Sequence, residues 1–84
     1  MISSELYARL LTKGYNGLQN FIDVLDWFDL HQIYISYRLD VNDTSIGYVG
    51  IAEFPPFSCK FTTEVHLTRS NALENILFVM TEFI

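Results

Sequence analysis

Three carboxylates with a regular spacing are the residues of this sequence best placed to do chemistry. Asp23, Asp26 and Asp29 follow one another at three-residue intervals. On a helix, residues at i and i+3 lie about 5–6 Å apart, which is close to the separation of successive phosphates along a nucleic-acid strand. Paired carboxylates act as general acid and base in a concave, partly dry site that shifts their pKa values, and a convex helix face does not provide one. The row therefore predicts either a solvated helix face or an acidic stripe that occupies a cationic groove on an enzyme.

The other reactive side chains form no catalytic or metal-binding motif. His31 and His66 are the only histidines and Cys59 is the only cysteine, whereas a zinc site needs several ligands at short, recognisable spacings. The sequence also lacks a nucleophile elbow and a glycine-rich phosphate loop. Cys59 has the same alternating parity as Phe57 and Phe61, on the apolar face of the predicted strand, so we expect it to be buried and inert. We predict no catalytic residue, no metal and no cofactor, and we expect that the protein is not an enzyme.

The acidic residues are concentrated in the middle of the chain. The net charge is −5, and five of the ten acidic residues fall between positions 23 and 43, where Arg38 is the only Lys or Arg. This balance disfavours direct nucleic-acid binding, which uses clustered Lys and Arg, and favours a basic protein partner. Trp27, beside the carboxylates, is either an interface anchor or a ring packed against the first strand. The predicted partner-binding residues are Asp23, Asp26, Trp27, Asp29, Asp40 and Asp43.

The chain carries more apolar surface than a small domain easily buries. Apolar residues make up 50% of its 84 residues and aromatic residues 15%, and surplus apolar surface is often used in a homodimer interface. Phe78 lies four residues from both Glu74 and Glu82, on the side of the last predicted helix where polar residues belong. We expect a homodimer that uses Phe78 and Val79 or the region of Tyr48.

Hydrophobic periodicity predicts the elements that position these residues. Ser3 can cap a first helix that ends near Lys13, followed by Gly14. Asn16 can cap a second helix that ends near Asp29, with a core face of Leu18, Phe21, Ile22, Leu25 and Phe28. The last helix is capped by Thr68 or Ser70, and its core face is Leu73, Ile76, Leu77, Met80 and Ile84.

Between these helices the apolar period changes to two, which predicts strands. Residues 33–41 and 57–67 alternate cleanly, and in residues 46–54 Gly47 and Gly50 indicate a bulge or close packing. The order is therefore α-α-β-β-β-α over a single domain, residues 1–84. We predict an α+β fold: a two-layer sandwich in which a three-stranded antiparallel meander is covered on one face by the helices.

Two families resemble this chain. The αβββα order, with TTEVHLTRSNALENILFVM as the final strand and helix, is similar to a double-stranded-RNA-binding domain. That resemblance implies duplex RNA binding, but the family's lysine cluster is replaced by TRSNALE, in which Arg69 is the only basic residue. The segments GYVGIAEFPPFSC and SNALENI resemble the turn and helix start of HicB-type antitoxins and related small phage domains, which share the β-β-β-α core.

The sequence also indicates where the protein acts. The N-terminus lacks the basic and apolar regions of a secretory signal, and the apolar run 76–80 is far shorter than the ~20 residues of a membrane span. We therefore expect a cytoplasmic protein that does not bind membranes. The predicted function is a small acidic protein-binding module, of the kind of a phage-type inhibitor or an antitoxin-like antagonist of a host nucleic-acid enzyme. The alternative is an RNA-binding domain of the double-stranded-RNA-binding topology.

Overall fold

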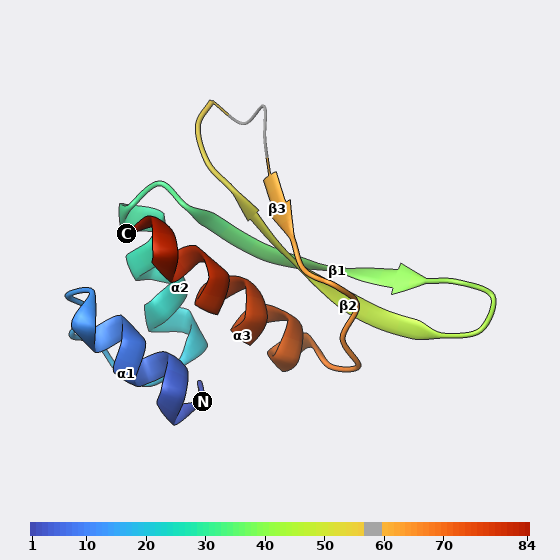
Figure 1. Cartoon of the computed structure of the whole chain (residues 1–84), viewed down its shortest axis with the longest axis horizontal. Helices are drawn as coiled ribbons and strands as arrows, with labels where there is room; N and C mark the ends of the chain where they lie inside the picture. The colour runs from blue at the N-terminus through green and yellow to red at the C-terminus, as the bar shows by residue number, and fades with distance from the viewer. Residues whose placement is uncertain (57–59) are drawn as a thin grey trace.

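The computed structural model describes residues 1–56 and 60–84, and the predicted fold class is confirmed. A three-stranded antiparallel sheet in the order β1-β2-β3 is covered by the helices on one side (Figure 1). No helix in these two described segments is long and apolar enough to cross a membrane. The elements are α1 (Ser4–Thr12), α2 (Phe21–Leu30), β1 (Tyr34–Val41), β2 (Ile46–Glu53), β3 (Lys60–Thr62), α3 (Arg69–Met80) and a final 3-10 turn, η1 (Thr81–Phe83).

The core lies between the three helices and the near half of the β1–β2 hairpin. Ala52 is the buried contribution of β2 to this core, and Tyr15 is buried although it lies in a loop. Apart from Tyr15, the core side chains carry no polar group, and their burial away from water stabilises the domain. They are Ile2, Leu6, Leu10, Tyr15, Val24, Phe28, Ile33, Ala52, Ile76, Leu77 and Met80.

The helix N-termini are capped by polar side chains. The Ser3 hydroxyl accepts a hydrogen bond from the Leu6 N–H at 3.1 Å, and the Thr68 hydroxyl accepts one from the Asn71 N–H at 3.1 Å. Both residues were predicted caps, and Thr68 rather than Ser70 serves the last helix. For the second helix the predicted cap, Asn16, is wrong, because Asn20 caps α2 through the Asp23 N–H at 2.8 Å.

The predicted core face of α2 is wrong in part. Leu18 precedes the helix and is 68% exposed, and Ile22 is 74% exposed. Val24 and Phe28 are instead the fully buried residues of the helix. The buried side of α2 is thus centred on Val24 and Phe28, and Phe21 and Leu25 only flank it.

Both N-terminal helices end in a Schellman motif, in which a left-handed residue lets two N–H groups bond back to the last turn. In α1 this residue is Gly14, with φ of 98°. In α2 it is Gln32, with φ of 60°. The Gln32 N–H donates to the Asp29 carbonyl at 2.9 Å and the Ile33 N–H to the Phe28 carbonyl at 3.0 Å. The second motif turns the chain from α2 into β1 and brings Ile33 into the core.

β2 runs close beneath α3. A Cβ added at Gly50 would lie 2.4 Å from the Ala72 carbonyl oxygen and 2.9 Å from the Ile76 Cβ. At Gly47 a Cβ would lie 2.3 Å from the Val65 side chain. The two glycines therefore mark close packing, one of the two alternatives that the sequence left open.

The hairpin of β1 and β2 is longer than the helix that covers it. Eight strand residues span about 26 Å and the twelve residues of α3 about 18 Å, so the far half of the hairpin extends past the helices (Figure 1). In that half of the hairpin, the prediction that the apolar face of the first strand is buried is wrong. Ile33 is buried, but Tyr37, Leu39 and Val41 are 44%, 53% and 59% exposed.

The third strand is shorter than predicted and its apolar face is not dry. β3 covers Lys60–Thr62, and only an isolated bridge between Tyr48 and His66 follows it. Ile51 pairs with Thr62, yet Tyr48 pairs with His66. The segment from β3 to His66 therefore contains one residue more than the part of β2 that it faces. The Gly50 N–H donates to the Thr63 hydroxyl at 2.9 Å instead of to a backbone carbonyl.

This bulge shifts the alternation by one residue. His66 thereby takes the side of Tyr48, while Val65 and Leu67 are 47% and 84% exposed. Phe61, before the bulge, is 38% exposed. Phe57 and Cys59 lie outside the described residues, so the burial of Cys59 stays a prediction.

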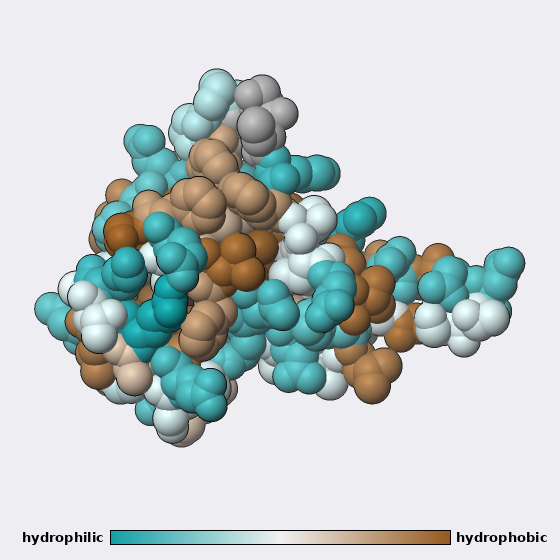
Figure 2. Space-filling model, in the orientation of Figure 1, coloured by the Kyte–Doolittle hydropathy of each residue, from teal (hydrophilic) through white to brown (hydrophobic). Residues whose placement is uncertain are grey.

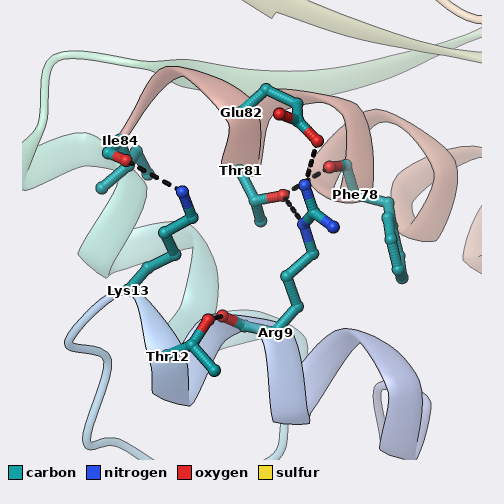
Figure 3. A network of polar contacts seen from close by, with 7 residues as sticks. All are labelled: Arg9, Thr12, Lys13, Phe78, Thr81, Glu82 and Ile84. Atoms are coloured by element: carbon teal, nitrogen blue, oxygen red, sulfur yellow. Dashed lines mark hydrogen bonds and ion pairs between the residues drawn. The ribbon is translucent and has the colours of Figure 1, made fainter.

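Polar contacts bind α1 to the C-terminal end of the chain (Figure 3). The Arg9 Nε donates to the hydroxyl of the buried Thr81 at 2.6 Å, and the same guanidinium forms an ion pair with Glu82. The guanidinium carbon also lies 5.3 Å from the centroid of the Phe78 ring. One turn later, the Lys13 Nζ donates to the Ile84 carbonyl at 3.3 Å. These contacts place the two ends of the chain on the same side of the fold.

Replacement of Gln32 by glycine should stabilise the protein. A left-handed backbone costs a residue with a Cβ about 1–2 kcal/mol. Glycine avoids this strain, but it loses more conformational entropy on folding, which offsets part of the gain in stability. We expect Gln32→Gly to raise the free energy of unfolding by about 0.5–1 kcal/mol in chemical denaturation. Gln32→Ala, which keeps the strain, should leave it nearly unchanged. Equal stability of the two variants would contradict the assignment.

Replacement of Gly50 by alanine should destabilise the protein, because the added methyl group meets a carbonyl of α3 that cannot move without the helix. We expect a loss of about 2 kcal/mol in the free energy of unfolding, the usual cost of overpacking. Ser36→Ala, on the exposed part of β1, is the matched control and should have little effect. A Gly50→Ala protein as stable as the parent would show that β2 and α3 are farther apart.

Candidate partner-binding surfaces

Asp23, Asp26 and Trp27 lie together around a shallow hollow on α2. Its volume is about 250 Å³. The wall opposite the helix is the segment that links α1 to α2, which contributes the buried Tyr15. We call this feature the acidic hollow, and its lining residues are Tyr15, Asn16, Gly17, Asp23, Asp26, Trp27 and Leu30.

Trp27 is held by other rings at the edge of this hollow. Its ring centroid lies 5.5 Å from that of Tyr15 in an edge-on arrangement and 4.5 Å from that of His31. The His31 Nδ1 is also 3.0 Å from the Trp27 carbonyl oxygen. The indole is half-buried. It therefore presents a fixed aromatic surface to the hollow.

The two carboxylates of the hollow differ in their hydrogen bonds and exposure. Asp23 accepts a hydrogen bond from the Leu18 N–H at 3.3 Å, which helps to hold the linking segment against α2. Asp26 is exposed, one turn further along the helix. Within residues 1–56 and 60–84 the structure records one ion pair, between Arg9 and Glu82. The negative charge at the hollow is therefore not neutralised by a described side chain of this chain.

The remaining predicted partner-binding residues lie elsewhere. Asp29 is exposed on α2 but does not line the hollow. Asp40 and Asp43 lie at the far end of the β1–β2 hairpin, at the opposite end of the molecule from α2 (Figure 1). The acidic segment of the sequence is thus divided between two distant places.

The predicted self-association residues are also separated. Tyr48 lies on β2, where its ring is 6.1 Å from that of Tyr37, and the Arg69 guanidinium carbon is 5.3 Å from its centroid. Phe78 and Val79 lie in the last turn of α3, at the opposite end of the helix from Arg69. Phe78 packs partly against the core, and Val79 is 43% exposed. The structure does not gather these residues into one patch.

An aromatic cluster that the sequence analysis missed lies beside the C-terminal turn. The ring of Phe61 is 5.9 Å from that of Phe54 and 5.2 Å from that of Phe83. A neighbouring hollow of about 310 Å³ is lined by Phe54 and Phe83 together with His31 and Gln32. No periodic signal points to this cluster, because its members come from three separate places in the chain: the residue after β2, β3 and η1. Among the described residues, no group of three or more His, Cys, Asp or Glu could hold a metal ion.

Comparison of the chain with models of known protein families, with curated proteins and with solved structures finds no match. The resemblances to double-stranded-RNA-binding domains and to HicB-type antitoxins therefore remain predictions, and the function is argued from the surfaces of this chain alone.

The Tyr15 hydroxyl reports on the hollow. Burial, and then the nearby Asp23 carboxylate and Tyr7, raise the pKa of Tyr15 above its usual value of about 10. Its phenol donates a hydrogen bond to the Leu18 carbonyl. A raised pKa means that the folded state holds this proton more tightly than the unfolded state does. Its contribution to stability is complete below the usual pKa and is lost as the pH rises through the raised pKa.

We expect one tyrosine to ionise later than the others in an alkaline titration followed by phenolate absorbance. Tyr15→Phe should remove that late step. Asp23→Asn should lower the pKa of Tyr15, because it removes a negative charge that disfavours the phenolate. Asp29→Asn is the control and should leave the titration unchanged. If Asp23→Asn has no effect, the carboxylate does not face the phenol.

Proposed function

We propose that this protein is a small acidic protein-binding module whose acidic hollow receives a Lys or Arg side chain of a basic partner. The observation that supports the proposal is the convergence of Asp23, Asp26 and Trp27, with Tyr15, around one concave site. The protein acts in the cytoplasm by binding and not by catalysis.

The residue types of the hollow suit a cation. Two carboxylates supply charge-assisted hydrogen bonds to an ammonium or guanidinium group. The half-buried Trp27 ring attracts a cation within about 6 Å of the ring centroid, and the buried Tyr15 ring supports it from the side. Because both rings are held by their neighbours, the site loses little side-chain freedom when it is filled, which favours affinity.

The partner class follows from the surrounding charge. A chain with a net charge of −5 associates faster with a basic surface, and salt suppresses that effect. Basic grooves with exposed Lys and Arg are typical of proteins that hold nucleic acid. The partner is accordingly a nucleic-acid-handling enzyme, and occupation of its groove would inhibit it in the manner of a phage-type or antitoxin-like antagonist.

Trp27 is the only tryptophan, so its fluorescence reports binding at the hollow directly. We expect an arginine-rich peptide to change this fluorescence, with an affinity that falls as salt rises. The double variant Asp23→Asn, Asp26→Asn should bind the peptide about tenfold more weakly, because two surface charge contacts are worth about 0.5–1 kcal/mol each. Circular dichroism of the variant checks that the fold is kept.

The matched control is Glu53→Gln, Glu64→Gln, which removes the same charge from the end of β2 and from the segment after β3. If both pairs weaken binding equally, only net charge matters and the hollow is not a site. Asp40→Asn, Asp43→Asn tests the distant acidic end of the hairpin in the same assay. Immobilised protein should retain purified nucleic-acid enzymes with basic grooves, and duplex DNA should compete for them.

The second candidate function is RNA binding. Arg69, the first residue of α3, is exposed and its guanidinium carbon lies 5.7 Å from the centroid of Tyr37 and 5.3 Å from that of Tyr48. Such a pairing of cation and rings can hold a phosphate beside a stacked base. An electrophoretic mobility shift with duplex RNA at low salt, lost in Arg69→Ala, would favour this function over protein binding.

A further inference from the structure

The outer edge of β1 offers unused backbone hydrogen-bonding groups. β1 is an edge strand, since the sheet order is β1-β2-β3. On β2, Tyr48 exchanges backbone hydrogen bonds with His66, and the Gly50 carbonyl accepts from the Thr63 N–H. These two residues therefore direct their backbone groups away from β1.

In an antiparallel ladder, directly opposed residues alternate between pairs that exchange both hydrogen bonds and pairs that exchange none. Leu39 and Tyr37, the register partners of Tyr48 and Gly50, must therefore also point their N–H and C=O groups away from β2. By the same alternation Ile35 and Val41 do so too. In the described part of the chain, no backbone outside β2 bonds to residues 35–41.

This edge has no proline, lysine or bulge and is not short, and its two charged residues, Arg38 and Asp40, have opposite signs, so they do not repel a second copy of the strand as a row of like charges would. Residues 34–41 read YISYRLDV, and their register with β2 runs unbroken over all eight residues. The far half of the strand lies beyond the helices, and Leu39 and Val41 are more than half exposed. Figure 2 shows apolar residues, in brown, continuing onto this arm at the right of the molecule.

We propose that the partner at this edge is a second copy of the same chain, paired antiparallel through β1 about a two-fold axis at Leu39. In this arrangement Leu39 opposes Leu39 of the second copy, and Tyr37 opposes Val41 of the second copy. Arg38 then opposes Asp40 of the second copy, and the symmetry makes this pair twice. The two sheets become one continuous sheet across the dimer.

Charge complementarity selects this axis among those that the strand permits. An axis at Arg38 would oppose two arginines and an axis at Asp40 two aspartates, and like charges directly opposite are unfavourable. An axis at Tyr37 would leave Arg38 opposite Ser36. An axis midway between two residues would place residues whose N–H and C=O groups point out from the edge opposite residues whose groups point toward β2. The hydrogen bonds of the ladder could then not form.

The Leu39 axis also keeps the two bodies apart. It overlaps the strands from Ser36 to Asn42, which run from beside the first residue of α3 to the end of the hairpin that lies away from α1 and α2 (Figure 1). The helices of each copy then lie at opposite ends of the joint sheet. The apolar side chains of Tyr37, Leu39 and Val41 gain neighbours from the second copy on one face, while Arg38 and Asp40 pair on the other. This interface does not involve the acidic hollow, so it stands or falls independently of the proposed function.

The test uses charge reversal, read by sedimentation velocity over a concentration series. Arg38→Asp alone and Asp40→Arg alone should each weaken self-association about tenfold or more, because each sets two like-charged pairs across the axis. An equimolar mixture of the two single variants should associate again, since each copy then supplies the complement of the other. The double variant Arg38→Asp, Asp40→Arg should also self-associate like the parent.

Lys60→Asp and Glu64→Arg are the matched controls, with the same changes of charge on or beside β3, and should not alter self-association. In the parent, hydrogen exchange at the amides of Tyr37, Leu39 and Val41 should slow as protein concentration rises. A parent that is monomeric at high micromolar concentration overturns the proposal. So does a mixture that fails to associate, or a dimer in which these amides exchange at an unchanged rate.

Discussion

The close approach of α3 to the middle of β2 is the contact on which the rest of the fold depends. With Gly50 beneath Ala72 and Ile76, no side chain separates the strand from the helix, so the two backbones nearly touch. Ala52, one step along the same face, is fully buried in the core with Ile76. This contact sets the depth of the core, and α1 and α2 complete it around α3. A larger residue at the contact would lift the helix and open the core along its length.

The same contact decides what remains uncovered. α3 is centred on the near half of a hairpin that is longer than the helix, so the far half carries an apolar face without a cover. On the other side, the bulge between Thr63 and His66 ends regular pairing along β3. The sheet thus has one short, interrupted edge and one long, regular edge. Exposed regular edges favour pairing with a further strand, which is why β1 rather than β3 is the edge with a proposed partner.

The two proposed surfaces lie at opposite ends of the molecule, and each has its own chemistry. The acidic hollow combines carboxylates with fixed aromatic rings, whereas the β1 edge offers backbone groups and one charge of each sign. A dimer joined through β1 would hold two acidic hollows on a rigid sheet. A partner with repeated basic sites, such as a long cationic groove, would then be bound at two points, and the second contact would be strengthened by the first.

The sequence alone determined the element order, two of the three helix caps, the turn after Gly14 and the antiparallel meander, because caps, glycine punctuation and apolar periods are local properties. It also indicated Asp23, Asp26 and Trp27, which share one face of α2. Only the tertiary structure decided which apolar faces are buried. The length of α3 relative to β1, the bulge at Thr63 and the late start of α2 after its cap Asn20 leave Leu39, Leu67 and Leu18 exposed. Tyr15 joined the hollow for the same reason. Its place depends on how the segment between α1 and α2 folds back onto α2, and no periodicity within that segment encodes this.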